Sequence, residues 1–316
     1  MTDNSIVSAN FGLFEILPKG CLFLDIIQQV INGLSLGSVY ALIAVGYSLV
    51  YSILLFSNFA HGGFLVIGGY ICYYALMSYG AGIWEASFAA VLGAGISAIL
   101  VERFAYRPIR ERTPVTLYLL IASMGMSIVI ENLFVVTIGG RFRALPPVLP
   151  MQPVSVFGFA TTSAFDILSL IVSIISLVAL QFFLNRTKWG LAIRAASYNL
   201  RTASLMGVNV NRLIAIVFFV AGLFAAVGGI FLSARYTLYP QLGSTITTKA
   251  FVAAVIGGLG SLPGAIIGSL ILGLAEMLTA GFVSSQFRDL VVFFLLIVTL
   301  IIRPSGLFGK AVSEKV

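Results

Sequence analysis

The chain has 316 residues, of which 59% are hydrophobic and only 9% are charged. A soluble globular protein carries about a quarter charged residues, so this composition excludes a water-facing surface over most of the molecule. The formal net charge of +7 does not indicate a nucleic-acid partner, because the chain lacks a basic patch with interleaved aromatic residues on a polar domain.

Apolar runs separated by polar breaks follow one another along nearly the whole chain. A bilayer core of about 30 Å requires about 20 apolar residues per helix, and several runs exceed this length. We therefore expect an all-α polytopic transmembrane helical bundle with about eight to ten spans, some of them broken or re-entrant. The expected segments are 22–55, 57–79, 84–104, 114–138, 164–185, 212–236, 246–259, 264–281 and 288–303.

Three parts of the chain are distinguished. Residues 1–21 are expected to form an N-terminal arm, which is retained because it lacks the basic start and uninterrupted apolar stretch of a secretory signal. Residues 22–303 form the transmembrane domain, and 304–316 form a cytoplasmic C-terminal tail.

The first segment, 22–55, is longer than one crossing requires at about 1.5 Å per residue. Its candidate breaks are Gly33, Gly37 and Gly46, and the sequence leaves open whether it crosses once or is interrupted. The small-residue spacing that lets helices approach closely in lipid occurs twice, at Gly33 with Gly37 and at Gly260, Gly264 and Gly268. Ordinary helix packing explains this spacing, and a lining of a transport route is the alternative.

The only histidine of the chain lies at a segment boundary, in the run SNFAHGGFLVIGGY. One histidine cannot build a metal site, so no metal ligands are predicted. A hydrogen-bonded structural role for His61 is the favoured interpretation, and contact with a transported solute is the alternative. Ser57 and Asn58 are suited to start a helix, because their side chains accept from orphan amide groups.

Two carboxylates interrupt apolar segments, Glu131 in 114–138 and Glu276 in 264–281. Charge inside a membrane is costly, so a functional role or a buried partner is the default expectation. Lys249 and Arg235 are the candidate partners. The alternative is an interfacial position, which is favoured for Glu276 because it lies nearer the end of its segment.

Basic residues indicate the topology. Three regions hold twelve of the 18 lysines and arginines: Arg103, Arg107, Arg110 and Arg112; then Arg186, Lys188, Arg194, Arg201 and Arg212; then Arg303, Lys310 and Lys315. The positive-inside rule places these regions in the cytoplasm. The connections 139–163 and 236–245 then lie outside, and four prolines predict that the first of them is an ordered, non-helical loop. This topology requires two crossings between 246 and 281, although 246–259 is short for a full span.

The cytoplasmic connection 185–212 is too polar to cross the bilayer, yet its alanines favour short helices and its glycines mark boundaries. An amphipathic helix with exposed arginines is the form expected of a docking element. The alternative is a membrane-surface loop that binds anionic lipid. The predicted docking residues are Gly190, Arg194, Ala195, Ala196, Arg201, Ala203 and Gly207.

Motifs for energy conversion are missing. The chain has no GxxxxGK[ST] phosphate loop, so it does not bind ATP in the P-loop manner. HExxH and CxxC are also absent, and Cys21 and Cys72 define no disulfide framework. We expect no catalytic residues and no cofactor on this chain.

From Asn32 to Tyr70 the chain reads NGLSLGSVYALIAVGYSLVYSILLFSNFAHGGFLVIGGY, and this stretch resembles the permease subunit of branched-chain amino acid ABC importers. The resemblance continues in order through ERFAYRPIRER (102–112), IASMGMSIVIEN (121–132), GLAIRAASYNLRTASLMGVNVNR (190–212) and AAVIGGLGSLPGAIIGSLILGLAEML (253–278). The chain is more similar to the first of the two paired permeases, because it lacks the longer N-terminal region of the second.

The resemblance implies that residues 22–303 are a permease domain, which forms the translocation route by alternating access with a second homologous permease. It also implies two cytoplasmic ATPases that hold ATP and Mg²⁺, a periplasmic substrate-binding protein, surrounding membrane lipid and a bacterial cytoplasmic (inner) membrane location. The stretch 190–212 corresponds to the ATPase-contacting loop of the family. Here Arg194 precedes Ala195 where the family pattern has a Glu, so the ATPase contacts are left open. Substrates of the family include leucine, isoleucine and valine, whereas related systems carry other amino acids, amides or urea.

Broken helices offer partial charges at their ends to a zwitterionic amino acid, so the glycine-flanked breaks near His61 and Gly260 are candidate route elements. The predicted route residues are Asn58, His61, Gly62, Gly63, Glu131, Gly257, Gly258 and Gly260. A competing hypothesis is an ion-coupled secondary transporter or channel that works without an ATPase, with Glu131 as a proton or cation site.

Overall fold

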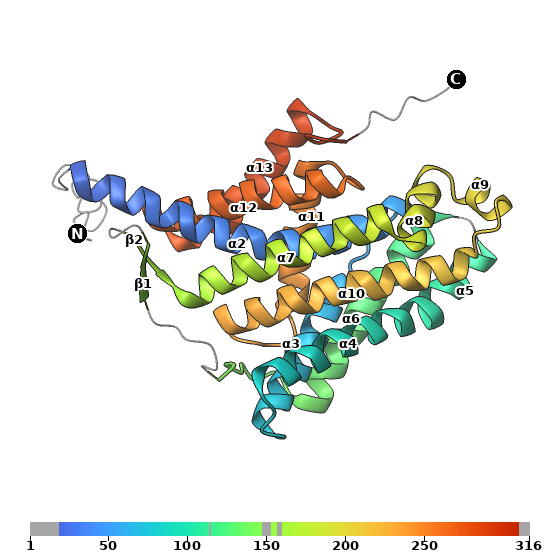
Figure 1. Ribbon diagram of the computed structural model, residues 1–316, viewed down its shortest axis with the longest axis horizontal. Helices are drawn as coiled ribbons and strands as arrows, with labels where there is room; N and C mark the ends of the chain where they lie inside the picture. Colours follow the sequence, from blue (N-terminus) through green and yellow to red (C-terminus); the bar gives the residue numbers. More distant parts are fainter. Residues whose placement is uncertain (1–18, 114, 147–152, 157–159, 310–316) are drawn as a thin grey trace, which may run out of the picture.

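The computed structural model describes residues 19–113, 115–146, 153–156 and 160–309. These residues form a helical bundle, which confirms the predicted fold class (Figure 1). The first half contains α2 (Lys19–Leu54), α3 (His61–Met77), α4 (Ile83–Val101), the π-helix η2 (Glu102–Tyr106), α5 (Arg107–Arg112) and α6 (Thr116–Ile138). The second half contains α7 (Ala164–Arg186), α8 (Lys188–Tyr198), α9 (Leu200–Leu205), α10 (Val210–Arg235), α11 (Leu242–Gly257), α12 (Leu262–Phe282), the 3-10 helix η3 (Ser285–Phe287) and α13 (Arg288–Ile302).

Each apolar segment predicted from the sequence corresponds to a helix. Within the described residues, seven helical stretches are long and apolar enough to cross a membrane, and α3 and α11 are shorter apolar helices. The outer connection also contains a small antiparallel hairpin of β1 (Pro153–Val156) and β2 (Ala160–Ser163), in which Pro153 pairs with Ser163. Pro147 and Pro150 of the same connection lie outside the described residues.

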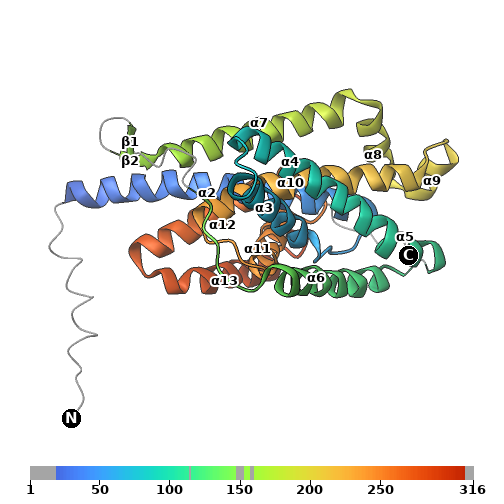
Figure 2. The same cartoon turned by 90° about the horizontal axis from the view of Figure 1, so that it is seen from below.

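Helix α2 is continuous for 36 residues, so none of its glycines breaks it. Gly33 and Gly37 instead let α12 approach: a Cβ on Gly37 would lie 2.9 Å from the Leu270 Cα, and one on Gly273 would lie 2.4 Å from the Gly37 nitrogen. Most side chains of α2 from Ser35 to Val50 are buried. The helix is therefore the central element around which the others pack, as the two views show (Figures 1 and 2).

The two ends of the bundle differ in charge. Helices α5, α8 and α9 lie together at one end, while β1, β2 and the start of α2 lie at the other (Figure 1). The two basic connections predicted to be cytoplasmic thus share one end. At the opposite end, Arg143 and Leu238 form a β-bridge, which joins the two connections predicted to be outside. With the positive-inside rule, α2 starts on the outer side, a point that the sequence had left undecided.

The turn between α11 and α12 lies beside the C-terminal end of α2, because a Cβ on Gly260 would lie 3.5 Å from the Ser52 Cα. The chain after α13 returns to this turn, where the Leu307 and Phe308 amides donate to the carbonyls of Ile256 and Gly257, both at 2.9 Å. Part of the predicted tail, up to residue 309, is therefore packed on α11. Lys310 and Lys315 lie outside the described residues, as does the predicted arm up to residue 18.

Candidate functional site

A buried charged cluster joins four helices in the outer half of the bundle. Glu276 of α12 is fully buried and forms an ion pair with Lys249 of α11, whose ammonium also lies 3.1 Å from the Asp289 carboxylate of α13. The hydroxyl of Tyr40, from α2, donates to Glu276 at 2.8 Å. The structure thus gives Glu276 a buried partner, which is the default expectation for a carboxylate in an apolar segment, and Glu276 does not extend to solvent.

An open cavity of about 370 Å³ borders this cluster. Pockets of about 300–1,000 Å³ with a few convergent polar groups are typical of small-molecule sites, and ionisable groups within a membrane protein typically mark solute pathways. The lining combines both charge signs with aromatic and aliphatic side chains: Tyr40, Tyr236, Thr237, Tyr239, Leu242, Thr245, Ile246, Lys249, Ser285, Arg288 and Asp289. This composition suits a small zwitterionic solute better than an apolar one.

A second ion pair lies at the outer end. Arg235, the other candidate partner for the intramembrane carboxylates, binds Asp166 at 2.7 Å, and the Ser35 hydroxyl donates to the same carboxylate at 2.9 Å. Ser35 is the middle residue of the sequence GLSLG (33–37), which matches the GxSxG spacing of a hydrolase nucleophile elbow. An elbow requires a sharp strand-to-helix turn, whereas Ser35 lies inside a continuous helix, so the match is a packing feature of α2.

Asn58 and His61 lie in the packed interior between α2, α3 and the π-helix. The Tyr106 hydroxyl donates to the Asn58 side-chain oxygen at 2.9 Å. His61 is fully buried, with Nε2 3.1 Å from the Ile43 carbonyl oxygen. Because a carbonyl only accepts, Nε2 carries the proton, which leaves Nδ1 as a buried acceptor without a partner among the described residues. The hydrogen-bonded structural role favoured from the sequence agrees with this geometry.

Replacing His61 by Ala is expected to destabilise the protein by about 3–5 kcal/mol, the range for removing a buried aromatic ring. The imidazole packs edge-on against Tyr47 and Phe64, with ring centroids 6.1 and 6.2 Å apart. Thermal unfolding in detergent measures the loss, and uptake is compared per folded complex. Unchanged uptake per folded complex would reject solute contact by His61.

The other predicted route residues are not all brought together. Gly62 is buried against α11, where a Cβ would lie 2.0 Å from the Gly243 oxygen, and Gly63 faces Ile130 of α6. Glu131 lies half-buried on α6 and has no ion pair among the described residues. Asn58, His61 and Gly62 are buried, so a solute does not reach them in the described conformation.

The backbone conformation and close packing of the α11–α12 turn require glycine at three positions. Gly258 and Gly260 have φ of +107° and +81°, which side chains with a Cβ rarely adopt. Gly257 is buried, and a Cβ there would lie 2.0 Å from the Gly264 oxygen. Their role in the described conformation is to make the turn and to admit the chain after α13.

The predicted docking connection folds into α8 and α9 at the basic end. Gly190, Ala196 and Ala203 are buried in the packing of these helices, whereas Arg201 is exposed. The Arg194 guanidinium donates to the Leu184 carbonyl and, at 2.9 Å, to the Asn185 side chain, so it holds the C-terminal end of α7. The exposed surface contains large apolar side chains that the sequence analysis did not single out as contacts: Tyr198, Leu205 and Met206, each at least 80% exposed.

A network of polar side chains connects the π-helix, α5 and α10 at the basic end of the bundle. Arg110 forms an ion pair with buried Glu102 at 3.0 Å and donates to Asn211 of α10 at 2.7 Å. Asn211 in turn donates to Glu111 at 3.0 Å. The network links α5 to the start of α10, which follows α9 in the chain.

The fold defines a multi-pass membrane protein, and its buried charged cluster beside an open cavity is typical of a solute pathway. The sequence matches a family described as "Branched-chain amino acid transport system / permease component" over residues 29–300. It is 41% identical to the high-affinity branched-chain amino acid transport system permease protein LivH of Salmonella typhimurium, covering 93% of this chain and 99% of the relative. It is 38% identical to the corresponding permease BraD of Pseudomonas aeruginosa, covering 92% and 98%. No solved structure matches.

The chain therefore belongs to the family of branched-chain amino acid transport permeases. It is the translocation subunit of an ABC transporter, not an enzyme, and it works in a complex with other subunits. The resemblance found in the sequence is confirmed.

Proposed function

We propose that this chain, paired with a second homologous permease, carries branched-chain or related amino acids across the bacterial cytoplasmic (inner) membrane by alternating access. The observation that carries the proposal is the near full-length similarity to permeases of that transport class. A periplasmic binding protein delivers the amino acid to the outer end. Two cytoplasmic ATPases, which hold ATP and Mg²⁺, drive the change.

The cavity beside Lys249, Arg288 and Asp289 is the proposed outer part of the route. Its two cationic groups suit a carboxylate and Asp289 suits an ammonium, while Leu242 and Ile246 offer apolar contact to an aliphatic side chain. Asn58, His61 and Gly62 would enter the route when α3 separates from α11. Selection among leucine, isoleucine, valine and other solutes is assigned to the binding protein.

The composition of the complex is tested by affinity purification of the tagged chain from its native membranes, followed by mass spectrometry. A second permease and two ATPases are expected in stoichiometric amounts, and leucine is expected to compete for uptake by the purified assembly. Recovery of the chain alone, in membranes that contain the other subunits, would contradict the proposal.

Docking of the ATPases on α8 and α9 predicts a cross-link. A cysteine at Arg201 or Leu205, in a chain with Cys21 replaced by Ser, is expected to cross-link to the ATPase, because both side chains are exposed at the basic end. Cys72 is fully buried and serves as an internal negative control. A cysteine at Gln241, exposed near the outer end, is the matched control and should not react. Absence of a cross-link from every position in 190–207 would reject the docking surface.

A further inference from the structure

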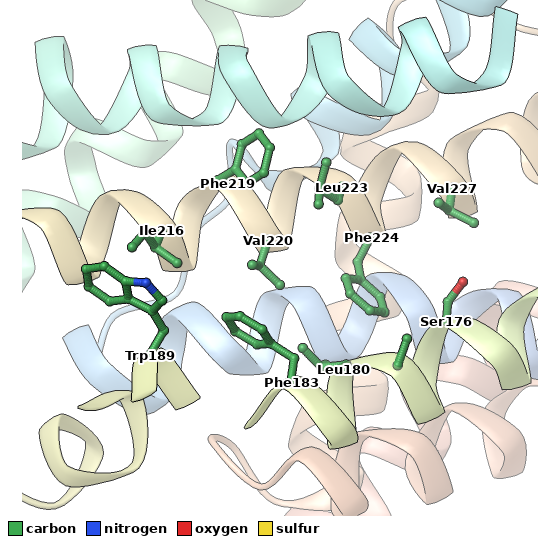
Figure 3. Close-up of a pocket in the computed structure, with 11 residues that line it drawn as sticks. Ser176, Leu180, Phe183, Trp189, Ile216, Phe219, Val220, Leu223, Phe224 and Val227 are labelled. Carbon is green, nitrogen blue, oxygen red and sulfur yellow. The ribbon is translucent and has the colours of Figure 1, made fainter. Parts of the chain in front are cut away.

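An apolar groove of about 520 Å³ lies between α7 and α10 and is closed at one end by α8. Figure 3 shows Val220 and Phe224 of α10 and Leu180 and Phe183 of α7 between the two helices, with the Trp189 ring at the α8 end of the groove. The groove is lined by Ser176, Ala179, Leu180, Phe183, Trp189, Ile216, Phe219, Val220, Leu223, Phe224 and Val227. Apart from one hydroxyl, the occupant would meet only hydrocarbon, aromatic rings and an indole.

The length of the groove corresponds to one leaflet. Along α10 it extends from Ile216 to Val227, which is about 16 Å at 1.5 Å per residue. The hydrocarbon core of a bilayer is about 30 Å thick, so the groove spans about half of it. A single acyl chain of one leaflet has this reach, whereas a transmembrane helix of another subunit would extend across both leaflets.

The walls also favour lipid over a helix. Helices that pack together in membranes use small residues at their interfaces so that the backbones approach closely. Here Phe224 and Val220 of α10 point toward Phe183 of α7, whereas Phe219 and Leu223 stand on the side of α10 that packs on Gly95 of α4 (Figure 3). These large side chains leave space for a lipid acyl chain between them, and they prevent the close backbone approach that a packed helix requires.

Three basic residues lie close in sequence to the residues that line the α8 end of the groove. Arg212 lies one helical turn before Ile216, Lys188 directly precedes Trp189, and Arg186 follows Phe183 by three residues. All three basic side chains are exposed, and none forms an ion pair among the described residues. Since no Asp or Glu occurs between Asp166 and Glu276 in the sequence, neither wall of the groove offers an acid to neutralise them.

We propose that this groove binds an anionic phospholipid of the leaflet at the basic end. One acyl chain lies between α7 and α10, the Trp189 ring lies at the level of the headgroup boundary, where tryptophan is enriched in membrane proteins, and the phosphate contacts Arg186, Lys188 and Arg212. The site is separate from the charged cavity near Lys249 and does not depend on the transported solute.

The chain contains two tryptophans, so Trp84→Phe leaves Trp189 as the only indole reporter. The full chain is placed in nanodiscs, and quenching of Trp189 by phospholipids brominated on the acyl chain is measured as a function of their mole fraction. Quenching by brominated phosphatidylglycerol is expected to reach half of its maximum at a mole fraction at least about fivefold lower than quenching by brominated phosphatidylcholine. Fivefold corresponds to the contribution of about one basic residue near an anionic surface.

Two variants separate the headgroup from the groove. Replacing Arg186, Lys188 and Arg212 together by Gln should bring the two lipids to the same half-saturation, without unfolding, because the three side chains are exposed. Val220→Phe, which fills the groove, should weaken quenching by both lipids. Arg201→Gln, an exposed basic residue of α9 that does not line the groove, is the matched control and should keep the preference for phosphatidylglycerol.

Three results would overturn the proposal. Equal half-saturation by the two lipids in the Trp84→Phe chain would remove the anionic specificity. Quenching that Val220→Phe leaves unchanged would show that the acyl chain does not occupy the groove. Insensitivity of Trp189 to either lipid would show that protein covers it.

Discussion

Replacing Glu276 by Ala is expected to destabilise the protein by about 3–5 kcal/mol, the cost of breaking a buried ion pair and leaving one charge without its partner. Lys249 would retain only the largely exposed Asp289, and the buried Tyr40 hydroxyl would lose its acceptor. Unfolding in mixed micelles with increasing SDS measures the change in free energy. Uptake by the assembled complex should fall with the folded fraction, and also because Lys249 and Tyr40, which line the cavity, lose their shared partner.

The controls separate charge from packing. Tyr40→Phe removes only the hydrogen bond to a charged acceptor, so a smaller loss of about 1.5–3 kcal/mol is expected. Replacing Lys249 and Glu276 together by Met removes both charges and should recover much of the stability, since buried pairs are often replaceable by apolar residues. The single variants Lys249→Met and Glu276→Met are measured beside the double variant. A loss of stability in the double variant equal to the sum of the two single losses would contradict the pairing. Recovery of stability without recovery of uptake would assign the pair to transport.

Replacing Gly273 by Ala is expected to destabilise the protein by about 3 kcal/mol or more, at the upper end of the range for overpacking. The new Cβ would lie 2.4 Å from the Gly37 nitrogen and 2.5 Å from the Gly37 Cα. Both are backbone atoms of the central helix α2, so relief requires the two helices to separate. The same SDS titration measures the effect, together with the yield of folded protein.

Gly125 of α6 is the matched control for this substitution. A Cβ at Gly125 would meet nothing within 4 Å, so Gly125→Ala should be neutral or stabilise the helix by up to about 1 kcal/mol. Equal behaviour of the Gly273 and Gly125 variants would show that α2 and α12 are not in close contact.

The sequence predicted most of the spanning helices because the bilayer imposes a length and a polarity that can be read directly from apolar runs. Where the sequence-based prediction of helix bounds or breaks failed, tertiary contacts determined the structure. The segment expected to begin at 57 forms a helix only from His61, because Asn58 is held by Tyr106 and the Phe59 amide donates to the Ser123 hydroxyl on α6. Glycines that looked like breaks in 22–55 are contact positions inside one helix.

The candidate site was predicted only in part, for the same reason. Lys249 was named as a partner of the intramembrane carboxylates, but Tyr40 is 236 residues from Glu276 along the chain. No local pattern indicates that contact. The docking connection was predicted from its polarity and alanines, whereas the internal role of Arg194 depends on how α8 folds back onto the end of α7.

Transport by reconstituted protein tests the central claim most directly, because the chain has no phosphate loop and is proposed to be driven by other subunits. Uptake of leucine into proteoliposomes should require the second permease, both ATPases, the binding protein and ATP, and the chain alone should show none under a proton or sodium gradient. Gradient-driven uptake by the chain alone, abolished by Glu131→Gln, would contradict the account and support an ion-coupled transporter.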